Sequence, residues 1–276
     1  MNIKKLLVRT LSGIIYCLII VGCIFWGEYG LLTLGCLFAV LGCIEFAKID
    51  NDISAKMIPT LILDVAGCIT LCFSFLIYPI IIWLAIMLAR FILELYINSE
   101  RPLHNLSHSF MSQIYIGIPM GIMVGIGYIL NPMIMLAIFC IIWINDTGAF
   151  LVGSLIGKHK LFERISPKKT WEGFFGGFMF CILAGFLFSR YCNEFFGMTS
   201  LKADMQTWII MSAIISIFGT WGDLVESMIK RSLHIKDSGN IIPGHGGILD
   251  RIDSLLLVLP SIFIYFMIII YMIAIP

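Results

Sequence analysis

Long apolar runs, separated by short polar segments, fill this chain. A helix that crosses a bilayer needs about 20 mostly apolar residues. Nine runs reach or approach this length: residues 11–27, 29–47, 57–76, 77–97, 110–130, 132–156, 173–190, 207–222 and 253–275. No polar loop marks the division near Tyr78 and Pro79, but residues 57–97 are too long for one span, so we divide them there. The pattern therefore predicts nine transmembrane helices.

The composition supports this assignment. Of the 276 residues, 60% are hydrophobic and only 13% are charged, and the mean hydropathy is +1.00. Soluble domains carry about 25% charged residues. The 18 Lys and Arg residues nearly balance the 17 Asp and Glu residues, so the net charge gives no reason to expect a nucleic-acid partner. We expect an all-α, polytopic integral membrane protein.

The positions of the basic residues indicate an orientation. Cytoplasmic loops of membrane proteins are enriched in Lys and Arg. If nine helices start from a cytoplasmic N-terminus, every Lys and Arg is cytoplasmic except Arg190 and Lys202 outside and Arg90 within a helix. One helix more or fewer between Lys56 and Lys158 would scatter these charges over both faces. The odd helix count and the cytoplasmic N-terminus therefore support each other.

Charged residues concentrate between Gly219 and Asp253, beside two predicted spans. On a helix that continues past Gly222, four polar residues fall at positions i, i+3, i+4 and i+7 and so share one face. They are Asp223, Glu226, Ser227 and Lys230. A face that combines carboxylates, a hydroxyl and an ammonium group suits a metal ion and a phosphate side by side.

A glycine-rich segment, residues 243–247, follows this face. Its glycines exclude regular helix and would let backbone N–H groups approach an anion. The next helix opens with Asp250 and Arg251. Carboxylates such as those of Asp223 and Asp250 are the ligands that Mg²⁺ prefers, with substrate phosphates completing its shell. Alternatively, Asp250 and Asp253 only favour a helix N-terminus while Arg251 extends toward the interface.

A second polar cluster lies inside the predicted helix at 132–156, where Asn145, Asp146 and Thr147 interrupt the apolar sequence. An ionisable residue within a span is a functional hypothesis by default. The alternative is that Asp146 lies near the cytoplasmic end of its helix, where a structural hydrogen bond satisfies it.

The third cluster is the basic loop between Lys158 and Gly173. Serine before proline, at Ser166 and Pro167, predicts a helix start, so Lys168, Lys169 and free N–H groups would converge on an anion. Cytoplasmic loops are basic in any case, which is the simpler explanation of this loop.

Several of these residues together are recognisable. Ser227-Met-Ile-Lys230-Arg231, Lys236-Asp237-Ser-Gly239 and Pro243-Gly-His245-Gly246-Gly247-Ile-Leu-Asp250-Arg251-Ile-Asp253 resemble the signature of the phosphatidate cytidylyltransferase (CDP-diacylglycerol synthase) family, with matching spacing. Asn145–Thr147 and Ser166–Gly173 are also similar to that family. Residues 1–130 resemble it only in forming hydrophobic helices.

This resemblance implies a CTP-dependent nucleotidyltransferase of phospholipid biosynthesis, which transfers the cytidylyl group of CTP to phosphatidic acid and releases pyrophosphate. It implies Mg²⁺ held by Asp223 and Asp250, with a second ion left open. The implied catalytic residues are Asp223, Asp250, Lys230, Arg231 and Asp146. The implied phosphate-binding residues are Lys168, Lys169, Ser227, Lys236, His245, Gly246, Gly247 and Arg251.

We further expect a single membrane domain over residues 1–276, in which 1–130 serve as a lipid-packing scaffold and 131–276 carry the catalytic helices and loops. The expected location is a bacterial plasma (inner) membrane, with the active site at the cytoplasmic face, where soluble CTP meets the lipid. Glycines four residues apart, at 153 and 157 and at 173 and 177, suggest close helix packing and a homodimer. A CTP-dependent lipid kinase and a membrane transporter remain alternatives.

Overall fold

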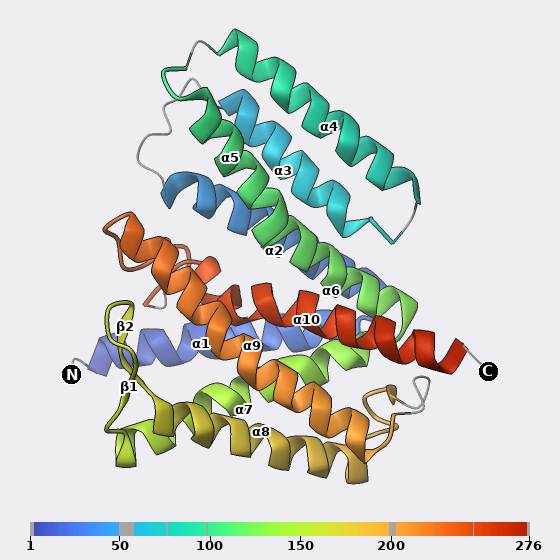
Figure 1. The fold of residues 1–276 in the computed structure, drawn as a ribbon, viewed down its shortest axis with the longest axis vertical. Helices are drawn as coiled ribbons and strands as arrows, with labels where there is room; N and C mark the ends of the chain where they lie inside the picture. Colours follow the sequence, from blue (N-terminus) through green and yellow to red (C-terminus); the bar gives the residue numbers. More distant parts are fainter. Residues whose placement is uncertain are drawn as a thin grey trace. The chain divides into compact units, whose positions relative to one another are not determined.

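The computed structural model describes residues 3–49, 58–75, 77–97, 99–198, 203–244 and 246–274. Helices account for most of these residues (Figure 1). In chain order the first elements are α1 (Ile3–Phe25), α2 (Glu28–Ile49), α3 (Ile58–Cys72), α4 (Ile77–Tyr96), α5 (Pro102–Ser112), the π-helical turn η2 (Gln113–Gly117) and α6 (Ile118–Ile129). They are followed by α7 (Pro132–Ile156), β1 (Lys160–Phe162), β2 (Ser166–Thr170), α8 (Trp171–Tyr191), α9 (Met205–Ser232) and α10 (Leu249–Ala274).

The helices match the predicted spans. Within the described ranges, eight helices are long and apolar enough to cross a membrane, with residues 102–129 counted as one, and α3 is a shorter apolar helix. The prediction of an all-α polytopic membrane protein is therefore confirmed. The division of residues 57–97 is also confirmed, because α3 ends at Cys72 and α4 begins at Ile77. The cytoplasmic N-terminus stays a prediction.

One local prediction is wrong. Ser166 and Pro167 do not begin a helix but open strand β2, which pairs antiparallel with β1. Helix α8 begins later, at Trp171, because the hydroxyl of Thr170 accepts a hydrogen bond from the N–H of Gly173 at 3.1 Å and so caps the helix. Proline fits the extended backbone of a short edge strand, where its missing N–H costs no ladder hydrogen bond.

The chain forms two compact units. The first, unit 1, comprises Met1–Ile129 and Leu233–Ile252, and the second, unit 2, comprises Leu130–Ser232 and Asp253–Pro276. The single membrane domain expected for residues 1–276 stays a prediction. Each unit contains part of the segment that carries the signature residues.

In unit 1, α2 packs against α1, α3 and α6, and α3 also packs against α4. A buried polar network joins α3, α4 and α5. Arg90 is 1% exposed and pairs with Glu94 at 2.7 Å, and it also donates to the hydroxyl of Ser109, which in turn donates to Asp64. Such groups are costly in an apolar interior unless they are paired, so the network fixes how these helices pack.

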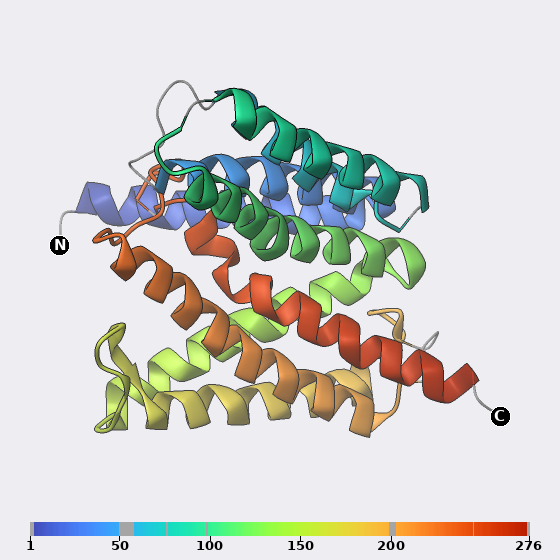
Figure 2. The same cartoon turned by 45° about the horizontal axis from the view of Figure 1, so that its top comes forward.

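In unit 2, α7, α8 and α9 lie side by side, as Figures 1 and 2 both show. Glycines allow the close approach of α7 and α8. A Cβ atom added to Gly173 would lie 2.9 Å from the carbonyl oxygen of Ala149, and one added to Gly177 would lie 2.8 Å from that of Asn145. These glycines therefore serve packing within one chain, and the homodimer stays a prediction without support from them.

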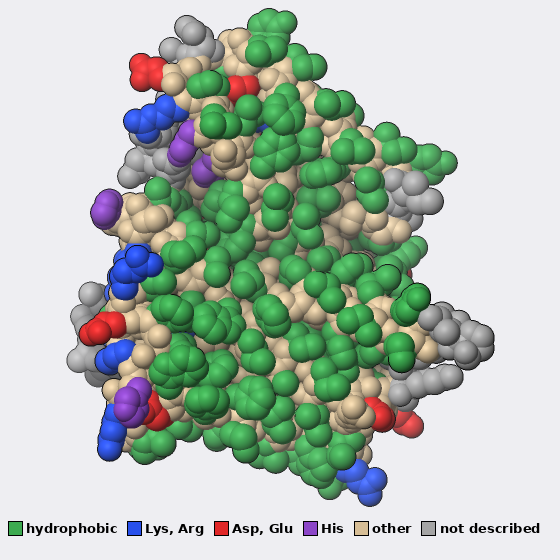
Figure 3. All heavy atoms as spheres, viewed as in Figure 1, with side chains coloured by type: hydrophobic (Ala, Val, Ile, Leu, Met, Phe, Trp, Pro, Cys, Tyr) green, Lys and Arg blue, Asp and Glu red, His purple; other side chains and the backbone are tan. Residues whose placement is uncertain are grey.

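The outer surface of the helices is strongly apolar. Large side chains such as Leu95 and Leu155 are 81% and 80% exposed. Hydrophobic side chains predominate on the face drawn in Figure 3, and the charged side chains visible there lie mainly at its margins. Exposed apolar surface on this scale suits contact with lipid acyl chains. The protein is integral to a membrane.

Candidate active site

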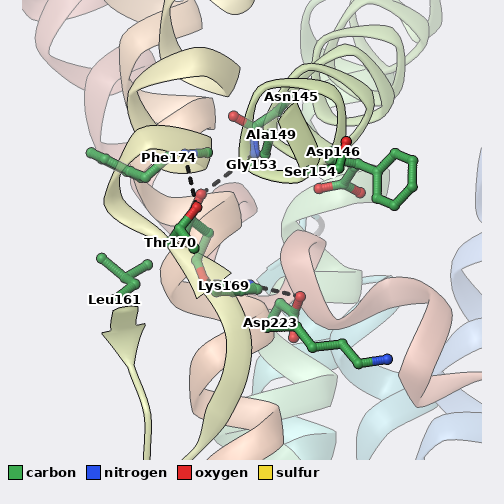
Figure 4. Close-up of a pocket in the computed structure, with 14 residues that line it drawn as sticks. Asn145, Asp146, Ala149, Gly153, Ser154, Leu161, Lys169, Thr170, Phe174 and Asp223 are labelled. Carbon is green, nitrogen blue, oxygen red and sulfur yellow. Dashed lines mark hydrogen bonds and ion pairs between the residues drawn. The ribbon is translucent and has the colours of Figure 1, made fainter. Parts of the chain in front are cut away.

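A cavity of about 420 Å³ in unit 2 gathers four of the predicted site residues (Figure 4). Its walls come from α7, the β1–β2 hairpin, α8 and α9. The lining residues are Asn145, Asp146, Ala149, Phe150, Gly153, Ser154, Leu161, Lys168, Lys169, Thr170, Gly173, Phe174, Thr220 and Asp223. Three clusters that the sequence separates by up to about 80 positions thus contribute Asp146, Lys168, Lys169 and Asp223 to one cavity.

An ion pair crosses this cavity. The ammonium group of Lys169 lies 2.7 Å from a carboxylate oxygen of Asp223 (Figure 4) and 3.4 Å from the carbonyl oxygen of Thr220. Both side chains are partly exposed, at 26% and 36%. Solvent therefore screens the pair, and its net contribution to stability is at most about 1 kcal/mol. Both groups remain accessible to a molecule that enters the cavity.

Asn145 determines where the neighbouring acid lies. Its side chain is buried, accepts a hydrogen bond from the hydroxyl of Ser216 at 2.6 Å and reaches the hydroxyl of Thr220 at 3.5 Å. These bonds connect α7 to α9. Because adjacent residues of a helix point about 100° apart, the next side chain, Asp146, is exposed and lines the cavity.

The lysines reach the cavity on the β1–β2 hairpin, whose base is held by Glu172. The Glu172 carboxylate accepts hydrogen bonds from the backbone N–H groups of Lys158, at 3.1 Å, and His159, at 3.2 Å. It also lies 2.6 Å from the ring nitrogen Nδ1 of His159. The N–H of Trp171 donates to the carbonyl of His159 at 2.9 Å and completes the closure. Glu172 was not among the predicted site residues.

The predicted polar face of α9 is present, because the helix continues to Ser232. The hydroxyl of Ser227 donates to Asp223 at 3.3 Å, and the ammonium group of Lys230 lies 2.6 Å from Glu226. Lys230 and Glu226 are buried, whereas Arg231 is exposed. Asp146, Asp223 and Glu226 all interact electrostatically with Asp253, so these four carboxylates of unit 2 form one electrostatic cluster.

In unit 1, Ser238 and residues 247–249 donate hydrogen bonds to two carboxylates. Asp250 accepts hydrogen bonds from the N–H groups of Gly247, at 2.8 Å, and Ser238, at 3.1 Å. Gly246 has a φ of +85°, and a Cβ atom there would lie 2.5 Å from the Asp250 carboxylate. Glycine is thus needed for both conformation and space. The anionic group that accepts a hydrogen bond from the Gly247 N–H is thus the carboxylate of Asp250, a side chain of the protein itself.

The second carboxylate is Glu45 of α2, which the sequence interpretation missed. It is 2% exposed and accepts hydrogen bonds from the N–H groups of Ile248, at 2.9 Å, and Leu249, at 3.0 Å, and from the Ser238 hydroxyl at 3.2 Å. A signal existed, because Glu45 is an acid inside the apolar run 29–47. Its partners, about 200 positions away, could not be read from the pattern.

The predicted residues divide between the units. Unit 2 holds Asp146, Lys168, Lys169, Asp223, Ser227, Lys230 and Arg231, and unit 1 holds Lys236, Gly246, Gly247, Asp250 and Arg251. The predicted metal ligands, Asp223 and Asp250, therefore belong to different units. His245 lies outside the described residues. Among the described residues, no group of three or more His, Cys, Asp and Glu side chains is placed to hold a metal ion. The phosphate and metal roles stay predictions.

The fold and the cavity define a polytopic membrane protein with a site of acids and lysines between helices. The sequence model of the cytidylyltransferase family matches residues 7–269, and the chain belongs to this family. The resemblance seen in the signature residues is thereby confirmed.

Curated relatives agree with this assignment. The chain is 52% identical over 124 residues to the phosphatidate cytidylyltransferase of Staphylococcus aureus (strain COL), a match that covers 44% of each chain. It is 48% identical over 124 residues to the phosphatidate cytidylyltransferase of Staphylococcus haemolyticus (strain JCSC1435), again over 44% of each chain. The matched part thus spans less than half the length of these relatives.

Proposed function

We propose that this protein transfers the cytidylyl group of CTP to phosphatidic acid, giving CDP-diacylglycerol and pyrophosphate for phospholipid biosynthesis. Family membership and the names of the relatives support the reaction. The observation that carries the proposal is the unit 2 cavity, in which Lys168 and Lys169 lie beside Asp146 and Asp223. Lysines suit a triphosphate, and carboxylates suit the cation that accompanies it.

In the proposed reaction, a phosphate oxygen of phosphatidic acid forms a bond to the α-phosphorus of CTP, and the bond from that phosphorus to the bridging oxygen breaks. Pyrophosphate leaves with the electron pair. The second pKa of a phosphate monoester is about 6, so the attacking oxygen is already anionic at pH 7 and needs no general base. Catalysis then consists of positioning and of neutralising charge, which the two lysines of β2 would supply.

Mg²⁺ fits the residues of unit 2. This ion uses one or two carboxylates together with substrate phosphates and waters, so it does not require a preformed cage of protein ligands. Asp223 lines the cavity, is partly exposed and belongs to the electrostatic cluster of unit 2. We propose Asp223 as a ligand, with Asp250 of unit 1 as the second ligand that the family resemblance implies. The bound ion would neutralise negative charge on the phosphates.

We also propose that the cavity faces the cytoplasm of a bacterial cell. CTP is a soluble nucleotide, whereas phosphatidic acid presents its phosphate at the membrane surface. The excess of Lys and Arg on the loops at the hairpin side supports this orientation.

The decisive experiment follows two labels. The purified protein in lipid nanodiscs receives phosphatidic acid, Mg²⁺ and CTP labelled at either the α- or the γ-phosphorus. We expect the α-label in the lipid fraction and the γ-label in pyrophosphate. Transfer of the γ-label to a lipid alcohol would instead identify a lipid kinase, and no transfer of either label would contradict the proposal.

A substitution at Lys169 tests whether the reaction takes place in the cavity. Lys169→Gln should lower kcat/KM at least about hundredfold, because a donor aimed at the phosphates is lost. Lys160→Gln is the matched control, since Lys160 is an exposed lysine of the same hairpin that does not line the cavity. Equal activity of the two variants would show that the cavity takes no part in the reaction.

A further inference from the structure

An apolar groove of about 410 Å³ runs along α1 in unit 1. Val8, Leu11, Ile15 and Ile19 of α1 recur every three or four residues and so line one side of it. The opposite side comes from α2, where Phe38 stacks on Tyr16 with 6.5 Å between ring centroids. The volume lies in the range of sites that hold small molecules, about 300–1,000 Å³.

The remaining wall of this groove comes from a longer segment, residues 241–244 and 246–251, which includes the glycines of the glycine-rich segment. Its backbone N–H groups at residues 247–249 are directed to Asp250 and Glu45. Its aliphatic side chains line the groove instead, and they are Ile241, Ile242, Pro243 and Ile248. The segment thus has a polar side built around carboxylates and an apolar side that faces the groove.

Three hydrogen bonds join α1 to the same segment. Arg9 donates from Nε to the carbonyl of Gly244 at 2.8 Å, and the hydroxyl of Ser12 donates to the carbonyl of Pro243 at 3.0 Å. The hydroxyl of Tyr16 donates to the carbonyl of Arg251 at 3.1 Å. Arg9 is exposed, and its guanidinium group lies against the Gly244 carbonyl, next to groove-lining Pro243. An apolar groove with a cationic group beside its wall complements a molecule with a hydrocarbon chain and an anionic head.

We infer that this groove binds one acyl chain of the lipid substrate, a glycerophospholipid with a phosphate-monoester headgroup, and holds that headgroup next to Arg9 and Gly244. The inference rests on the proposed function for the identity of the lipid. It assigns specificity for the lipid substrate in part to α1, a helix that contains none of the signature residues. Chain binding in the groove positions the phosphate, because groove wall and headgroup site belong to one segment.

Photocrosslinking tests the site without catalysis. Phosphatidic acid with a diazirine at the end of one acyl chain is irradiated with the full-length protein in phosphatidylcholine nanodiscs, and labelled peptides are mapped by mass spectrometry. We expect labels within residues 8–19 and 241–248, reduced several-fold by excess unlabelled phosphatidic acid. Equal labelling by a diazirine phosphatidylcholine would show ordinary annular lipid, and labelling elsewhere would overturn the inference.

A matched pair of variants tests the groove through KM for phosphatidic acid. Ile15→Trp fills the groove, whereas Leu18→Trp places the same side chain at a position of α1 that does not line it. We expect Ile15→Trp to raise KM for phosphatidic acid about tenfold, equivalent to losing the burial of about two methylene groups, with KM for CTP unchanged. Identical behaviour of the two variants would refute the groove. If the wild type proves inactive, the proposed function fails, and crosslinking still decides the groove.

Discussion

At the scale of single residues, Asp223 connects the observed cavity to the proposed chemistry. Its carboxylate is paired with Lys169 and also accepts a hydrogen bond from the hydroxyl of Ser227. An ammonium group and a metal ion both compensate a carboxylate, so the residue has the charge that either partner requires. Loss of this charge should therefore affect the reaction more than the fold, because the side chain is partly exposed.

Asp223→Asn should lower kcat at least about hundredfold, since an amide cannot supply the charge that the proposed ion requires. Asp204→Asn is the matched control. Asp204 precedes α9, and its carboxylate accepts a hydrogen bond from the N–H of Thr207 at 2.8 Å. Asparagine performs this capping role equally well. We expect that control to keep wild-type activity and thermal stability. The assignment of Asp223 would be wrong if Asp223→Asn turned over CTP at the normal rate.

Glu45→Gln tests the carboxylate that organises the glycine-rich segment. One amide oxygen would have to replace two carboxylate oxygens, and the NH₂ group would face backbone donors. We expect a loss of about 1–3 kcal/mol, seen as a lower apparent melting temperature and as faster proteolysis within residues 233–248. Glu28→Gln, at an exposed position of the same helix, should change neither. Unchanged proteolysis of Glu45→Gln would show that the segment does not depend on this acid.

At the scale of elements, the β1–β2 hairpin carries both cavity lysines, and Glu172 holds its base. Glu172→Gln keeps the shape of the side chain but removes the charge that faces two N–H groups and His159. We expect KM for CTP to rise about tenfold or more while thermal stability stays close to wild type, because small displacements of binding groups weaken substrate alignment.

Glu163→Gln is the control for this variant, since Glu163 is exposed and lies between the two strands of the same hairpin. If Glu172→Gln lowered only the yield of folded protein, with KM for CTP unchanged, Glu172 would be structural and would not position the lysines. Restoration of KM by Glu172→Asp would indicate that charge at the hairpin base matters more than side-chain length.

The elements also show what sequence reasoning can reach. Helices were predictable because each must span the bilayer with apolar residues, a requirement that leaves a long signal. The hairpin at residues 160–170 was missed, since its short strands are fixed by pairing with each other and by the packing of β2 against α8, and not by a periodic pattern. The start of α8 followed the Thr170 cap and not the Ser166–Pro167 pair.

The candidate site, like the fold, was predictable from the sequence only in part. Asp146, Lys168, Lys169 and Asp223 could be selected because charge near a membrane span demands a reason, and the cavity brings them together. The N–H of Gly247 was expected to bind phosphate, but it donates to Asp250. Glu45 completes that arrangement from α2. Such long-range pairings depend on packing, for which a single sequence contains no direct signal.

At the scale of the whole molecule, the signature residues belong to both compact units. Residues 227–232 lie in unit 2, 233–252 in unit 1, and Asp253 again in unit 2. The cavity with its lysines belongs to one unit, and the groove with the glycine-rich segment belongs to the other. One unit thus offers a charged cavity and the other an apolar groove, which are the two kinds of surface that the proposed substrates, a nucleotide and a lipid, require.

Membrane topology supplies the last prediction. In unit 2, α7, α8 and α9 follow one another as packed neighbours, so the β1–β2 hairpin and the end of α9 lie at one end, and residues 192–198, 203 and 204 lie at the other. With a cytoplasmic N-terminus, single cysteines at Arg164→Cys and Lys236→Cys in a cysteine-free background should react with an impermeant maleimide only after cells are permeabilised. Glu194→Cys should react in intact cells. The reverse pattern would place the N-terminus and the lysine-lined cavity outside, where CTP is absent, and would contradict the orientation and the proposed reaction together.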